Sequence, residues 1–127
     1  MQGKHLYEYA VIRLVPRVER EEFFNVGIIL FSKRAKYIKA LYKVDEDKLN
    51  LFSSELDRES LFANLHVFDK ICSGTKEAGP IAALDMPERF RWLTAVRSAS
   101  IQTSRPHPGF SDDLDRTLEI LFRELVL

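Results

Sequence analysis

The stretch that decides the fold reads LYEYAVIRLV and occupies residues 6–15. Successive side chains of a strand point to opposite faces. Both faces of this stretch are largely apolar, one with Tyr7, Tyr9, Val11 and Val15, the other with Ala10, Ile12 and Leu14. Such a pattern is typical of a central strand that is covered on both faces. Pro16 has no N–H for a ladder, so we expect it to end the strand.

Two more strands are predicted directly downstream. Residues 24–31 are dense in Val, Ile and Phe, and Asn25 and Gly27 near the start indicate a turn or a bulge. Residues 32–35 fit a hairpin turn. Residues 36–44 alternate in polarity, and their lysines suit an edge strand, where charge discourages association between sheets. The three strands are expected to form an antiparallel meander.

A long helix is predicted over residues 55–72, after an irregular acidic stretch at 45–52. Ser54 and Asp57 match a capping box, and Gly74 is a C-terminal stop signal. One face of this helix carries an apolar stripe at helical spacing, made of Leu61, Leu65, Phe68 and Cys72.

The C-terminal part predicts a short helix, a fourth strand and a final helix. Pro87 suits the first turn of a helix over residues 87–94, and residues 98–103 form a weak strand. The two prolines and one glycine of residues 105–109 indicate a loop. Ser111, Asp112 and Asp113 then cap the last helix. Its apolar stripe comprises Leu114, Leu118, Leu121, Phe122 and Leu125.

These elements predict an α+β fold. We expect a mainly antiparallel sheet of three to four strands, opened by the N-terminal meander and packed on one face by two long helices and one short helix. A chain of 127 residues can bury enough surface for one core, so residues 1–127 are expected to form a single domain.

Several chemistries lack the residues they need. No apolar segment approaches the roughly 20 residues of a membrane span. The chain has one cysteine, its three histidines are isolated, and neither phosphate-loop nor nucleophile-elbow motifs occur. We therefore expect the protein to bind no metal and no cofactor, and to be a non-enzyme. Lone Cys72 and the charged first 20 residues favour a cytoplasmic location.

Charge is balanced in total but unevenly distributed. Residues 1–43 hold nine basic and four acidic residues, whereas residues 44–60 hold two basic and six acidic ones. Basic side chains surround Tyr37 and Tyr42 on the predicted hairpin, namely Lys33, Arg34, Lys36, Lys39 and Lys43. They are solvated edge lysines in one interpretation and a platform for single-stranded nucleic acid in the other.

A second polar set lies in and around apolar elements. Arg13 interrupts the first strand, so it needs a partner such as Glu21, Glu22, Asp112 or Asp113. Arg97 directly precedes the fourth strand, Gln102 lies in it, and Ser104 and Arg105 follow it. Two interpretations stay open. These groups form an internal salt bridge that ties loops to the sheet, or a binding site for a peptide, a phosphate or a partner surface.

A family resemblance rests on short runs along nearly the whole chain. YEYAVIRLVP (residues 7–16) and EFFNVGIILFS (residues 22–32) resemble the opening of a bacterial family known as domain of unknown function 3037. FRWL, RS, IQTS and DD at residues 90–93, 97–98, 101–104 and 112–113 agree with it. The polar positions that match the family pattern are Arg13, Glu22, Asn25, Gly27, Arg97, Gln102, Ser104 and Asp113.

The resemblance implies a small single-domain protein with no established activity. Genes of such proteins often lie beside genes for HipA-like kinases, which implies such a kinase as a cytosolic partner. Our main hypothesis is thus a non-enzymatic interaction or accessory domain that binds a protein. The alternatives are a nucleic-acid-binding module that uses residues 33–43, and a small enzyme with a polar site around Arg13, Glu22, Arg97, Gln102 and Asp113. The sequence leaves the oligomeric state open.

Overall fold

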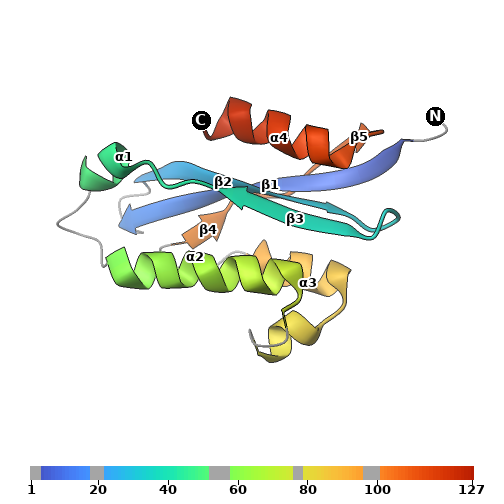
Figure 1. Cartoon of the computed structure of the whole chain (residues 1–127), viewed down its shortest axis with the longest axis horizontal. Helices are drawn as coiled ribbons and strands as arrows, with labels where there is room; N and C mark the ends of the chain where they lie inside the picture. The colour runs from blue at the N-terminus through green and yellow to red at the C-terminus, as the bar shows by residue number, and fades with distance from the viewer. Residues whose placement is uncertain (1–3, 18–21, 52–57, 76–78, 96–100) are drawn as a thin grey trace.

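The computed structural model describes residues 4–17, 22–51, 58–75, 79–95 and 101–127. Their fold is α+β, as predicted, with a five-stranded antiparallel sheet (Figure 1). The strands are β1 (His5–Arg17), β2 (Glu22–Ser32), β3 (Tyr37–Tyr42), β4 (Ile101–Thr103) and β5 (His107–Ser111). The helices are α1 (Glu46–Leu51), α2 (Arg58–Ser73), the 3-10 turn η3 (Pro80–Ala83), α3 (Met86–Leu93) and α4 (Leu114–Leu125).

The N-terminal strand is the centre of the sheet. The order is β3-β2-β1-β4, and β5 pairs with β1 on the same side as β4. The meander β1-β2-β3 and the edge position of β3 are therefore confirmed. The expected end at Pro16 is wrong, because β1 continues to Arg17, which pairs with Glu22. An irregularity between Leu14 and Arg17 accommodates the proline, whose N–H is missing from the ladder.

The predicted bulge lies at the start of β2. Ile12 pairs with Gly27 and Arg13 pairs with Asn25, so Val26 is the extra residue on β2. Gly27 is required there because a Cβ would lie 2.5 Å from the carbonyl oxygen of Leu41 on β3. Neighbouring strands approach closely at this point. The bulge places Asn25 directly opposite Arg13.

The fifth strand corrects the loop that residues 105–109 predict. Residues 107–111 pair with β1, from His5↔Ser111 to Tyr9↔His107. Pro108 is tolerated because β5 is an edge strand, where the missing N–H faces away from the ladder. The side chain of Tyr7 lies against Gly109, at the space a Cβ would fill. Tyr7 thus covers a backbone that has no side chain of its own.

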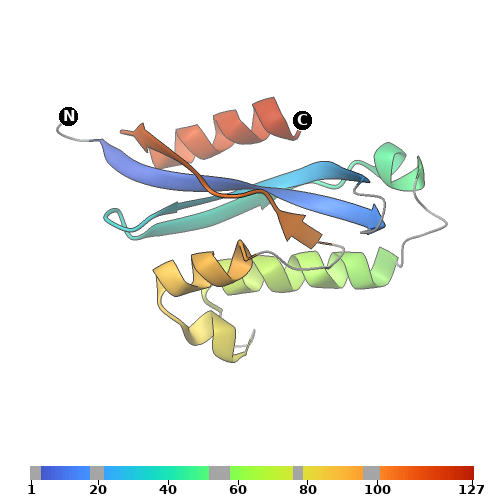
Figure 2. The same ribbon diagram turned by 180° about the vertical axis from the view of Figure 1, so that it is seen from behind.

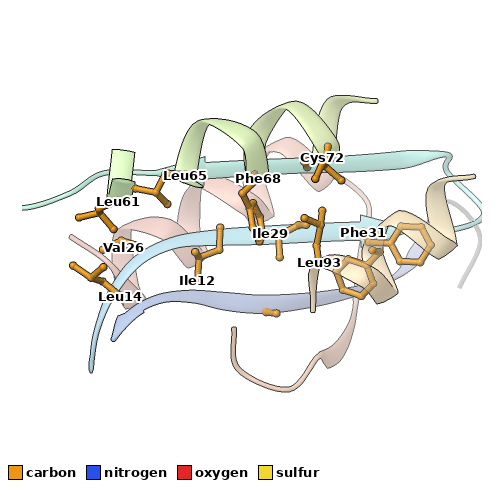
Figure 3. Packing of buried hydrophobic residues seen from close by; sticks show 14 of the residues in the cluster. Ile12, Leu14, Val26, Ile29, Phe31, Leu61, Leu65, Phe68, Cys72 and Leu93 are labelled. Carbon is orange, nitrogen blue, oxygen red and sulfur yellow. The ribbon is translucent and has the colours of Figure 1, made fainter. Parts of the chain in front are cut away.

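Helices cover both faces of the sheet, which corrects the prediction of one covered face. α2 and α3 lie on one side, and α4 lies on the other (Figures 1 and 2). Ile12, Leu14 and Ile29 pack against α2 and α3, including Leu65, Phe68 and Leu93 (Figure 3). Val11, Ile28 and Leu30 pack against Leu114 and Leu118 of α4. The reason is the apolarity of both faces of β1 and β2, because one layer of helices would leave half of these side chains in water.

The described helix ends lie within one residue of the predicted ones, except in the acidic segment. α2 ends at Ser73, and Gly74 has the positive φ of 74° that a C-terminal stop needs. The prediction that residues 45–52 are irregular is wrong, because they contain α1. The side chain of Asp45 accepts from the N–H of Asp47 at the start of this helix. α3 begins one residue earlier than predicted, with Asp85 as its cap. The capping pair Ser54 and Asp57 and the strand positions 98–100 lie outside the described residues.

Candidate functional site

Three of the predicted polar residues form one row across the sheet. Arg13 of β1 pairs with Asn25 of β2 on one side and with Gln102 of β4 on the other. Directly paired residues project from the same face of a sheet. The bulge and the short strand β4 together bring these three residues into one row, and the Asn25 side chain lies on the face that carries α4. One member of the row contacts α4, since the Asn25 Nδ2 donates to the carbonyl oxygen of Leu125 at 2.9 Å.

Arg13 is half-buried and stacks on an aromatic ring. Its guanidinium carbon lies 4.2 Å from the centre of the Phe23 ring, and Phe23 is 49% exposed. The buried Nε of Arg13 has no hydrogen-bond partner among the described residues. Asp113 lies at the start of α4, about 18 Å along the helix from the end that contacts Asn25. Glu21, Glu22 beyond its backbone, and Arg97 lie outside what the structure describes.

The remaining polar candidates beside β4 have different surroundings. Ser104 is buried, and its Oγ accepts from the N–H of Val11 at 2.9 Å and donates to the carbonyl oxygen of Arg105 at 3.1 Å. Ser104 therefore completes the ladder where β4 ends. Arg105 is exposed and makes no ion pair with a described carboxylate.

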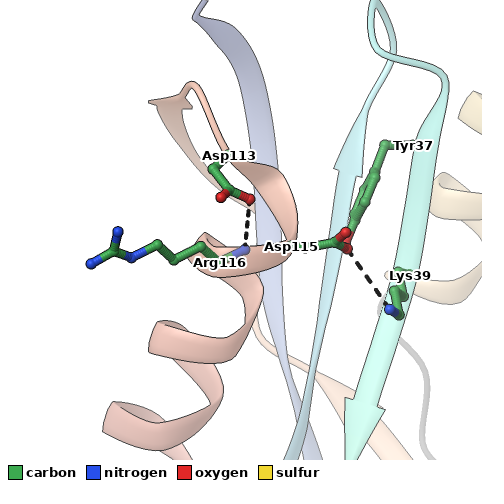
Figure 4. A network of polar contacts seen from close by, with 5 residues as sticks. All are labelled: Tyr37, Lys39, Asp113, Asp115 and Arg116. Carbon is green, nitrogen blue, oxygen red and sulfur yellow. Dashed lines mark hydrogen bonds and ion pairs between the residues drawn. The ribbon is translucent and has the colours of Figure 1, made fainter.

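The basic hairpin is only partly free. Lys33, Arg34, Lys36 and Lys43 are exposed. The Tyr37 hydroxyl instead donates to Asp115 of α4 at 2.7 Å, and Lys39 lies 3.7 Å from the same carboxylate (Figure 4). Burial and the bond to Asp115 raise the pKa of Tyr37. Tyr37 thus holds α4 against β3, and the nucleic-acid hypothesis stays a prediction.

An apolar groove lies on the opposite face, between α2, α3 and β4. It encloses about 230 Å³ and is lined by Asn64, Val67, Phe68, Ile71, Trp92, Leu93, Ala95, Ile101, Gln102 and Thr103. Val67 is 47% exposed and Trp92 is 38% exposed, although both belong to the groove wall. The Oγ1 of Thr103 is buried and has no hydrogen-bond partner among the described residues.

The sequence predictions missed this groove. Val67 lies off the apolar stripe of α2. Trp92 is partly exposed on α3, whose buried residues are Phe90 and Leu93. A usable signal exists: two large apolar residues outside the stripes of their helices. It is weak, since single exposed apolar residues are common, and only the packing of α2 beside β4 brings the two together.

Other chemistry finds no site in the described part of the chain. No three His, Cys, Asp or Glu side chains gather there to hold a metal ion. Cys72 is buried, and burial together with nearby Asp69 raises the pKa of its thiol to about 12. A thiol that stays protonated is a poor nucleophile. None of the described helices is both long and apolar enough to cross a bilayer.

Comparison with known families agrees with the resemblance of the sequence runs. A family model described as "Protein of unknown function (DUF3037)" matches residues 9–126. The chain belongs to the DUF3037 family. The match to DUF3037 includes every strand partner of the Arg13 row and every residue of the groove wall. No curated protein and no solved structure matches the chain.

Proposed function

We propose that this chain is a non-enzymatic protein-interaction domain that docks a partner in the groove between α2, α3 and β4. The observation that carries the proposal is the exposure of Val67 and Trp92 in the wall of this groove. Phe68, Ile71 and Leu93 of the core line the same groove. A cluster of exposed large apolar side chains is a cost in water and a gain in an interface. Tryptophan is also among the residues that contribute most to binding at protein interfaces.

The dimensions of the groove favour a protein side chain over a free metabolite. Sites for small molecules usually enclose 300–1,000 Å³ and converge several polar groups on the ligand. This groove encloses about 230 Å³, and no charged side chain is among the described residues that line it. It fits one or two apolar side chains that a larger partner presents. A HipA-like kinase, which the family resemblance implies, is the partner that we propose to test first.

A matched pair of variants tests the proposal. Val67→Asp places a charge in the groove wall, whereas His66→Asp places the same charge on the preceding residue of α2, which is exposed and not part of the wall. Tagged wild-type protein and both variants would be purified from cells of the native host, and co-purifying proteins quantified by mass spectrometry. We expect a stoichiometric partner that wild type and His66→Asp retain and that Val67→Asp loses at least tenfold.

Circular dichroism and urea unfolding of each variant would establish that it is folded before the comparison. If all three proteins recover the partner equally, the partner binds outside the groove. Recovery of no specific partner by the wild type would contradict the proposed function itself.

A further inference from the structure

In the described part of the sheet, β3, β4 and β5 each have one edge without a strand partner, and β3 and β5 carry features that oppose pairing with another strand. On β3, Lys39 and the following Lys43 are exposed charges. On β5, Pro106 precedes the strand and Pro108 lies within it. Lysine and proline are the residues that natural sheets use to protect their edges. β4 has neither, since its three residues are Ile101, Gln102 and Thr103.

The outer edge of β4 has backbone groups with no strand partner among the described residues. Ser104 lies opposite Val11, to which its N–H donates at 2.9 Å. Hydrogen-bonded pairs alternate with non-bonded pairs along antiparallel strands. Gln102 therefore bonds to Arg13 of β1, while the N–H and C=O of Ile101 and Thr103 point away from β1. No other strand of the described chain pairs with this edge.

The same two residues connect the edge to the groove. Ile101 and Thr103 are opposite Leu14 and Ile12, so their side chains project toward α2 and line the groove. Figure 2 shows β4 between β1 and α2. A strand added outside β4 would place every second side chain above this groove, between β4 and the exposed Val67 and Trp92.

Charge beside the edge restricts the added strand further. Arg105 follows β4 by two residues, is exposed, and makes no ion pair with a described carboxylate. An added strand that extends past Thr103 would therefore be favoured by an acidic residue at that end.

We propose that β4 binds an extended segment of the protein partner as a sixth strand. The segment carries apolar side chains at alternate positions, which enter the groove, and an acidic residue that faces Arg105. This inference rests on the proposed function and deepens it, because it states the form that the docked partner takes: main-chain hydrogen bonds give affinity, and the groove selects side chains.

A phage-displayed library of random ten-residue peptides is the probe, with the full chain as bait. We expect enriched peptides to alternate apolar residues and to carry an acidic residue at one end. Synthetic versions of the best peptide would be measured by fluorescence anisotropy against wild type, Val67→Asp, His66→Asp and Arg105→Glu. Val67→Asp is expected to weaken binding at least tenfold, Arg105→Glu about threefold to tenfold, and His66→Asp less than twofold.

Methylation of peptide N–H groups separates strand addition from simple groove binding. Methylating the amides that face β4 is expected to weaken binding at least tenfold, and methylating the intervening amides less than threefold. Hydrogen exchange read by NMR would show the amides of Ile101 and Thr103 protected only in the complex.

Each contrary result has a separate meaning. Peptides that bind Val67→Asp weakly can still bind the wild type equally well with and without methylated amides. That result would overturn strand addition and leave the groove as a protein-binding site. Protection of Ile101 and Thr103 by concentration-dependent dimers without peptide would replace the proposed partner by a second copy of the chain. Failure to enrich any peptide would also overturn strand addition, while the co-purification experiment with Val67→Asp would still decide the proposed function independently.

Discussion

At the scale of single residues, Gly27 shows why the start of β2 has its sequence. A Cβ at this position would lie 2.5 Å from the Leu41 oxygen and 2.8 Å from the Tyr42 Cβ, and both atoms belong to the neighbouring strand. We expect Gly27→Ala to lower the free energy of unfolding by about 1–3 kcal/mol, because the strands must separate to admit the methyl group. Urea unfolding would measure this loss. Ala63→Ser, on the exposed side of α2, is the control and should stay within about 0.5 kcal/mol of wild type.

Cys72 links a single buried group to the pH dependence of stability. Burial and Asp69 raise the pKa of its thiol from 9.0 to about 12, against the opposing charge of Arg89. Above pH 9 the thiol ionises in the unfolded chain while it stays protonated in the folded chain. The unfolded state then binds fewer protons, so stability falls as pH rises from 9 toward 12.

The corresponding measurement compares wild type with Cys72→Ala. The difference between their free energies of unfolding should change by about 1.4 kcal/mol between pH 7.5 and pH 10, with the wild type losing stability relative to the variant. Other titrating groups are common to both proteins and cancel. Two stability curves that run parallel over this range would contradict the raised pKa.

At the scale of elements, the start of α4 depends on one side chain. The Asp113 Oδ1 accepts from the N–H of Arg116 at 3.1 Å (Figure 4), and the Ser111 Oγ accepts from the N–H of Asp113 at 3.0 Å. We expect Asp113→Ala to cost about 0.5–2 kcal/mol in thermal or urea unfolding, because the helix loses its cap. Asp112→Ala removes the same charge from an exposed neighbour and should cost less. Asp113→Asn, which keeps an accepting oxygen, should restore most of the loss; equal effects of all three changes would point to charge alone.

At the scale of the whole molecule, helices cover both faces of the sheet, so truncating a residue under either face should cost a similar free energy of unfolding. Ile28 packs under α4, and Ile29 packs under α2 and α3; both are fully buried. Ile28→Val and Ile29→Val should therefore each lower the free energy of unfolding by about 0.5–1.5 kcal/mol. Chemical unfolding of both variants tests the architecture, since a sheet covered on one face would make one of these changes nearly neutral.

Much of the fold follows from local pattern in the sequence. The alternation in residues 6–44 predicts β1, β2, β3 and the edge position of β3, because which face a side chain takes depends only on its place in the strand. Helical spacing and the signals at Gly74, Pro87 and Asp113 predict α2, α3 and α4 for the same reason: helix caps and stripes are made within a few residues of chain.

Tertiary structure alone decided β5, the side of the sheet that α4 covers, and the candidate site. A segment with Pro108 and Gly109 becomes a strand only because β1 offers an edge and Tyr7 covers the glycine. The row of Arg13, Asn25 and Gln102 and the groove of Val67, Trp92 and Thr103 join residues from separate elements. Their exposure and their partners depend on how distant segments pack, and such packing leaves no periodic signal in any one segment of the chain.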